Sequence, residues 1–145
     1  MAGWPGTHWV EIEGLGEALF CHATPRSDTE IFTRFTPEDR LLPVFEGLDV
    51  PVVCGHTHMQ FDRAVGRIRV LNAGSVGSPF GEPGAYWLLL GPTVQFRHTT
   101  YNLTKATERI RATKYPQAED FAAANVLRPP SESQVLALFA KVELK

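Results

Sequence analysis

The chain has 145 residues, of which 43% are hydrophobic and 21% charged, and its formal net charge is −2. This length is typical of a single domain, and the hydrophobic content is sufficient for a buried core. The small net charge gives no electrostatic reason to expect binding to nucleic acid or to a membrane surface, and the apolar runs are too short to span a bilayer.

The first third of the chain predicts a β-hairpin and then a helix. Residues 8–12 alternate in polarity and residues 18–21 are apolar, so the second strand of the hairpin is expected to be buried. Thr36 is expected to cap a helix that starts at Pro37, because proline favours the first helical position. Leu41, Leu42 and Phe45 then fall on one face of the helix, and Gly47 is expected to be its C-cap.

Strands are predicted through the middle of the chain. Residues 50–54 form a buried apolar run, residues 67–71 form another strand, and residues 86–99 form a second hairpin around a tight turn. Cys21 and Cys54 each end an apolar run, which indicates reduced, buried thiols and predicts a cytoplasmic protein.

Helices are predicted in the last third. Apolar residues recur at helical spacing from Leu103 to Ile110, and an alanine-rich helix is expected over residues 120–125. Ser131 and Gln134 form a predicted capping box for a final helix. The apolar stripe of that helix consists of Val135, Leu138, Phe139 and Val142. Because strands come first and helices last, an α/β (α+β) layer fold is expected.

Histidines follow two of the predicted strands. Gly55, His56 and His58 come directly after the strand of residues 50–54, and His22 follows the strand of residues 18–21. In an extended chain, residues two apart project to the same side, so His56 and His58 are expected to face one site. A single histidine is more often a surface or hydrogen-bonded residue, but this combination favours metal ligands.

A loop of small residues follows the strand of residues 67–71. Asn72, Gly74 and Ser75 belong to it, and backbone N–H groups in such a loop can bind an anion. The alternative is a tight turn that requires glycine. The loop is neither a P-loop nor a dinucleotide fingerprint, because the required lysine and glycine spacing are absent.

Taken together, these segments resemble the calcineurin-like metallophosphoesterase family, most closely its small bacterial and archaeal phosphodiesterase-type members. The resemblance covers roughly residues 8 to 100 and rests on the His22 segment, the Gly-His-Thr-His sequence and the Asn72 loop. It implies that residues 1–101 form part of the metallophosphoesterase β-sandwich, flanked by helices. Residues 102–145 are then a helical C-terminal extension that packs on it.

The resemblance also implies a function for individual residues. In relatives, histidines matching His22 and His56 bind one metal ion and the histidine matching His58 binds a second, so that phosphodiesters or phosphomonoesters are hydrolysed. Manganese, iron, zinc and nickel all suit such ligands. The residues expected to shape the substrate or anion loop are Gly55, Asn72, Gly74 and Ser75.

The other ligands of the family are missing from this sequence. Relatives carry an Asp-x-His pair, a bridging Asp and an Asn-His-Asp motif whose histidine acts as an acid, and none of these occurs in the 21 residues before His22. No catalytic residue is therefore assigned. Two doubly charged ions about 4 Å apart repel by on the order of 16 kcal/mol at an effective dielectric constant of about 20. Asp62 does not replace the bridging carboxylate, because it is expected to be an exposed loop acid paired with Arg63.

Three hypotheses follow. In the first, the chain is the C-terminal part of a metallophosphoesterase for small phosphoesters, inactive alone and completed by an N-terminal half from a longer chain, a partner or a second copy in a homo-oligomer. The second is a non-catalytic interaction module built on the truncated fold. The third, ranked last, is a single zinc ion held by His22, His56 and His58.

Overall fold

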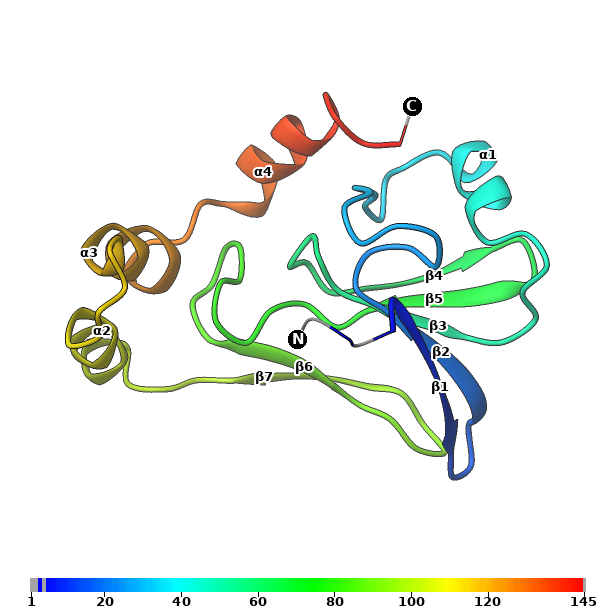
Figure 1. Cartoon of the computed structure of the whole chain (residues 1–145), viewed down its shortest axis with the longest axis horizontal. Helices are drawn as coiled ribbons and strands as arrows, with labels where there is room; N and C mark the ends of the chain where they lie inside the picture. The colour runs from blue at the N-terminus through cyan, green and yellow to red at the C-terminus, as the bar shows by residue number, and fades with distance from the viewer. Residues whose placement is uncertain (1–2, 4, 145) are drawn as a thin grey trace.

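The computed structural model describes residue 3 and residues 5–144. It is a mixed α/β fold with a sheet flanked by helices, as the sequence predicted (Figure 1). Met1, Ala2, Trp4 and Lys145 lie outside the described residues, and with them the outermost positions of the predicted regions 1–101 and 102–145. No helix in the described part of the chain is long and apolar enough to cross a membrane.

The main sheet brings three strand ends to one edge. Among the described residues its strand order is β1-β2-β3-β5-β4. β1 (Thr7–Ile12) and β2 (Gly16–Cys21) form the predicted antiparallel hairpin. β2 pairs in parallel with β3 (Val52–Cys54), which pairs in parallel with β5 (Ile68–Asn72). The carboxyl ends of β2, β3 and β5 therefore meet, and the residues that follow them are neighbours.

The outer strand β4 (Phe61–Val65) was not predicted. It pairs antiparallel with β5, so Asp62 lies in a strand rather than in a loop. The Asp62 carboxylate is 2.6 Å from the guanidinium of Arg69, not of Arg63, because diagonal residues on paired strands share a face. The prediction for Asp62 is corrected accordingly. The Arg63 side chain instead donates to the backbone carbonyls of Thr33, Arg34 and Thr36.

The first helix is shorter than predicted. α1 spans Glu38–Leu41 and passes into the 3₁₀ helix η1 (Leu42–Val44). Pro43 has no N–H to continue the α-helical hydrogen bonds, which accounts for the change. The predicted cap is also wrong, because the hydroxyl of Thr36 is used elsewhere and donates to Glu143 at 2.7 Å.

The hydrophobic core lies on the face of the main sheet that α1 covers. Leu19, Val52 and Val70 point into it from three adjacent strands and are at most 2% exposed. Burial of such side chains contributes roughly 1.5–3 kcal/mol each. Cys54 belongs to this core and Cys21 packs against it; both thiols are free, as predicted, and burial raises the pKa of Cys21 to about 11. The core thus holds in place β2 and β3, the strands that precede the predicted ligands His22 and His56.

The second predicted hairpin forms a separate two-stranded sheet of β6 (Ala85–Leu89) and β7 (Gln95–Thr99). Its turn touches the turn of the first hairpin, where a Cβ on Gly14 would lie 2.5 Å from Pro92 Cγ. Only glycine is accommodated there, since φ of Gly14 is also positive, at 78°. The two hairpins meet at these tips (Figure 1).

Helices fill the last third of the chain, and we call residues 102–144 the C-terminal arm. α2 spans Leu103–Arg111, and α3 (Ala118–Phe121) continues into the π-helix η2 (Ala122–Leu127). α4 (Glu132–Phe139) begins with the predicted capping box of Ser131 and Gln134.

The apolar stripe predicted for α4 is only partly buried. Val135 is 5% exposed, whereas Leu138 and Val142 are each 59% exposed. The reason is that α4 lies on loops at the edge of the protein rather than on a sheet face (Figure 1). The arm therefore contacts the rest of the chain at a few specific points, described below.

Candidate metal centre

The segments that follow β2, β3 and β5 are held to one another by backbone hydrogen bonds. The N–H of Gly55 donates to the carbonyl of His22 at 2.9 Å, and the N–H of Ala73 donates to the carbonyl of Cys54 at 2.9 Å. The sheet ladder thus continues beyond the strands and sets the positions of the predicted site residues.

Two of the predicted ligands are in direct contact. His22 Nε2 lies 3.1 Å from His56 Nδ1, and the rings meet edge to face with centroids 4.9 Å apart. Two nitrogens bound at about 2.05 Å to a tetrahedral ion lie about 3.3 Å apart. The separation therefore fits a pair of ligands on one ion, which would replace the proton that the two nitrogens share.

The backbone around these histidines is not extended. β3 ends at Cys54, and both His56 (φ 64°) and His58 (φ 58°) are in the left-handed region. Non-glycine residues in this region cost about 1–3 kcal/mol each and cluster at functional sites. The predicted extended backbone at His56 and His58 is therefore wrong; the two side chains have different partners, although both line one cavity.

His58 is directed toward the far end of the small-residue loop. Its Nδ1 lies 2.7 Å from the carbonyl oxygen of Ser78, and its ring stacks on Phe80 with centroids 5.7 Å apart. Since a carbonyl oxygen only accepts, Nδ1 carries a proton, and in the neutral imidazole Nε2 then keeps its lone pair. A second ligand site at His58 Nε2, separate from the His22–His56 pair, is compatible with this arrangement.

The three histidines line one open cavity of about 480 Å³, together with residues of β6 and of the Ala73–Val76 loop. They do not converge on a single point, and the described residues contain no group of three His, Cys, Asp or Glu side chains close enough to hold one ion. The donor set thus fits part of a coordination shell, and carboxylate ligands are absent from it.

Electrostatics favour the neutral, ligating form of His56. Burial lowers the pKa of His56 below its ordinary value, and the neighbouring His22 lowers it further. The backbone of Thr29 and the carboxylate of Asp28 act in the opposite direction. A lowered pKa leaves the imidazole uncharged near neutral pH, which is the state that binds metal.

The buried side chain of Asn72 joins two segments of the site by hydrogen bonds. It is 1% exposed, its Nδ2 donates to the carbonyl of Gly55 at 2.5 Å and to the Thr57 hydroxyl at 3.1 Å, and its Oδ1 accepts from the N–H of Gly74 at 2.9 Å. The side chain therefore links the Asn72 loop to the segment carrying His56 and His58. The role of Thr57 was missed, although its position between the two histidines was the available signal.

The Asn72 loop requires glycine at its centre. Gly74 has φ 81°, and a Cβ there would lie 2.8 Å from both Gln60 Cγ and Tyr86 Cβ. The Ser75 hydroxyl accepts from the N–H of Ser78 at 3.0 Å. Because the N–H of Gly74 is bound to Asn72, it is not free for an anion; anion binding by Gly55, Asn72, Gly74 and Ser75 stays a prediction.

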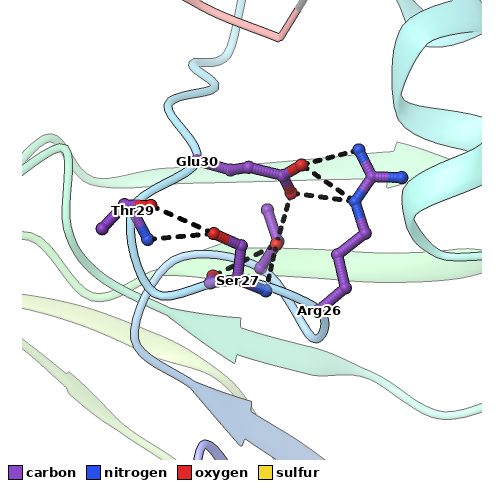
Figure 2. A network of polar contacts seen from close by, with 5 residues as sticks. Arg26, Ser27, Thr29 and Glu30 are labelled. Carbon is purple, nitrogen blue, oxygen red and sulfur yellow. Dashed lines mark hydrogen bonds and ion pairs between the residues drawn. The ribbon is translucent and has the colours of Figure 1, made fainter.

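A polar network fixes the chain directly after His22 (Figure 2). The buried hydroxyl of Thr24 donates to the Glu30 carboxylate at 2.6 Å, and Arg26 Nε donates to the same carboxylate at 2.9 Å. Hydrogen bonding to Arg26 lowers the pKa of Glu30; partial burial raises it and the Thr24 hydroxyl lowers it. This network was not predicted from the sequence.

A model of the calcineurin-like phosphoesterase superfamily domain matches residues 2–91. Among solved structures, hypothetical protein PH1004 of Pyrococcus horikoshii OT3 is 21% identical, with a TM-score of 0.68 over 83% of this chain and 50% of that one. This likeness concerns the fold alone. This chain thus spans half the length of that relative.

Two further structures are more distant in shape. Protein TM1076 of Thermotoga maritima is 28% identical, with a TM-score of 0.41 over 67% of this chain and 55% of that one. Wild-type Vps29 of Entamoeba histolytica, solved in complex with zinc, is 19% identical, with a TM-score of 0.44 over 70% of this chain and 64% of that one. A comparison with curated proteins finds no match.

Proposed function

Because the chain belongs to the calcineurin-like phosphoesterase superfamily, we propose that it supplies the histidine ligands of a metal-dependent phosphoesterase site. The observation that carries the proposal is the contact between His22 and His56, whose nitrogens are 3.1 Å apart at the ends of adjacent parallel strands. This distance suits a shared ion. The left-handed backbone at His56 and His58 also has a cost that a purely structural role does not explain.

The residues of the site would have different functions. His22 Nε2 and His56 Nδ1 bind one divalent ion, and His58 Nε2 is available to a second. Bound divalent ions lower the pKa of water and stabilise charge on phosphate oxygens. Asn72 and Thr57 hold the histidine segment in place, and the open cavity admits a small phosphoester.

The anionic ligands are the missing part of this site. Three neutral imidazoles do not offset the repulsion of on the order of 16 kcal/mol between two divalent ions about 4 Å apart. We infer that carboxylates come from polypeptide outside residues 1–145, from a partner or from a second copy. Residues 1–101 would then be the C-terminal half of the domain and residues 102–145 its extension.

A non-catalytic interaction module is the second candidate. In its favour, the described residues hold no complete metal site, and the outer edge of β1 pairs with no other strand among them. Trp9 on this strand is 48% exposed. An unpaired strand edge invites pairing with another chain, which would serve assembly as well as catalysis.

The experiment that tests the proposal combines metal analysis with hydrolysis. The 145-residue chain is titrated with Mn²⁺ and Zn²⁺, and bis-p-nitrophenyl phosphate turnover is measured in parallel. We expect about one ion per chain, lost in His56→Ala but kept in His98→Ala, and little turnover. Absence of metal binding would favour the interaction module. Two ions per chain with turnover that His58→Ala abolishes would show that the carboxylates are already supplied.

A further inference from the structure

His58 is held from two sides by one short loop. The carbonyl of Ser78 accepts the proton of Nδ1 at 2.7 Å, and the ring of Phe80 lies almost parallel to the imidazole, at an interplanar angle of 25°. The first contact selects the Nδ1–H tautomer, and the second limits rotation of the ring. Ser78 lies near the end of the predicted small-residue loop and Phe80 just after it, and neither was predicted as a site residue.

That loop is in turn held by the C-terminal arm. The Ser78 hydroxyl donates to Asn125 Oδ1 at 3.0 Å, and Phe139 meets Phe80 edge to face at 6.3 Å. The N–H of Gly81 donates to the carbonyl of Pro130 at 2.9 Å. Asn125 lies in η2, a π-helical turn of the kind often found at functional sites.

The arm is anchored to the body of the protein at separate points. Glu132 at the start of α4 forms an ion pair with Arg34 at 2.7 Å. Beyond the end of α4, Glu143 accepts from the Thr36 hydroxyl at 2.7 Å, and the N–H of Leu144 donates to the carbonyl of Ile31 at 3.0 Å. α4 is thus fixed at both ends, and its Phe139 packs against Phe80 in the loop that holds His58.

We propose that the C-terminal arm positions His58, with Asn125 and Phe139 as positioning residues that act through Ser78 and Phe80. The consequence is an imidazole with a fixed tautomer, whose Nε2 lone pair is presented in one direction. As far as it concerns metal binding, this inference rests on the proposed function. The geometry of His58 itself does not depend on it.

The test reads the tautomer of His58 in the full, metal-free chain. Long-range ¹⁵N–¹H spectra at a pH where the imidazole is neutral distinguish Nδ1–H from Nε2–H. We expect His58 of the wild type to be almost entirely Nδ1–H. Asn125→Ala and Phe139→Ala are expected to shift it toward a mixture of tautomers. Leu138→Ala, which truncates the exposed neighbour of Phe139, is the matched control and should leave it unchanged.

Zinc titration of the same proteins provides the second measurement. The one ion expected in the isolated chain is held by His22 and His56, so Asn125→Ala should leave its affinity unchanged while the His58 tautomer shifts. An unchanged His58 tautomer in both arm variants would overturn the inference; if Phe139→Ala does not fold, Asn125→Ala decides alone. A locked tautomer that the variants lose, in a wild type that binds no zinc, would support positioning and refute the metal proposal.

Discussion

His22 Nε2 and His56 Nδ1 are 3.1 Å apart, although the two residues are separated by 34 positions in the sequence. Their proximity results from the parallel pairing of β2 with β3, which places both histidines just beyond one edge of the sheet. If they hold one ion together, they should behave as a unit in binding experiments.

A double-mutant cycle measures this coupling. His22→Ala and His56→Ala are each expected to weaken Zn²⁺ binding by about tenfold or more, since tenfold corresponds to about 1.4 kcal/mol. The double variant should be little worse than either single variant, because loss of one ligand already breaks the chelate. Isothermal titration of the four proteins gives the coupling. Strictly additive losses would mean that the two histidines bind separate ions.

The backbone strain at His58 predicts an unusual response to glycine. With φ at 58°, His58→Gly should be about 1 kcal/mol more stable than His58→Ala, since alanine retains the left-handed penalty and both variants lose the same side chain. Urea unfolding measures the difference. In the strand β7, His98→Gly should instead be less stable than His98→Ala by about 0.5–1 kcal/mol. The same order of stability at both positions would argue against strain at His58.

Gly74 and Gly77 form a matched pair in one loop. Gly74→Ala must accommodate a positive φ and two contacts at 2.8 Å, one of them with the rigid Tyr86 Cβ, so we expect a loss of about 2 kcal/mol. A Cβ on Gly77 would meet no atom within 4 Å, so Gly77→Ala should change stability by less than about 0.5 kcal/mol. Thermal unfolding compares the two. Equal effects would show that the contacts at Gly74 relax freely.

The Glu30 network predicts a pH-dependent stability. The lowered pKa of Glu30 means that the folded protein favours the carboxylate, so this contribution is present above the unfolded value of about 4.3 and is lost as pH falls through the lower folded value. Glu30→Gln should lower the free energy of unfolding by about 0.5–1 kcal/mol at pH 7 and leave it unchanged at about pH 3. Urea unfolding between pH 3 and pH 7 tests this.

An Arg26→Gln background provides the control for Glu30. In this background, Glu30→Gln should lower the free energy of unfolding by less than in the wild type, because the main partner of the carboxylate has already been removed. A Glu30→Gln effect that is equally large at every pH, or equally large in both backgrounds, would contradict the assignment.

Patterns of apolar residues were sufficient to predict most strands and the strand ends that carry His22 and His56. β2 and β3 are short buried runs bounded by turn residues, and such runs are recognisable without tertiary information. β4 escaped prediction because Asp62 and Arg63 interrupt its apolar pattern. Both charges are satisfied by tertiary partners, Asp62 by Arg69 and Arg63 by three backbone carbonyls.

The detail of the site could not be predicted for a similar reason. Histidine enters the left-handed region more often than most residues, but it still favours an extended backbone, so the surrounding contacts must maintain this conformation at His56 and His58. The partners of His58, Ser78 and Phe80, follow it by about twenty residues, and their position depends on the C-terminal arm. Sequence patterns identify which residues are ligand candidates, but not which way each one points.

The parallel pairing of β2 and β3 has a consequence for folding kinetics. A parallel pair cannot form through a tight turn, so the chain between His22 and His56 must close as a long loop before the two rings meet. An ion bound by both rings would join the two ends of that loop only in the folded protein, and it would stabilise the folded state by its binding free energy. Metal would then slow unfolding more than it speeds folding, provided that the rings meet only after the folding transition state.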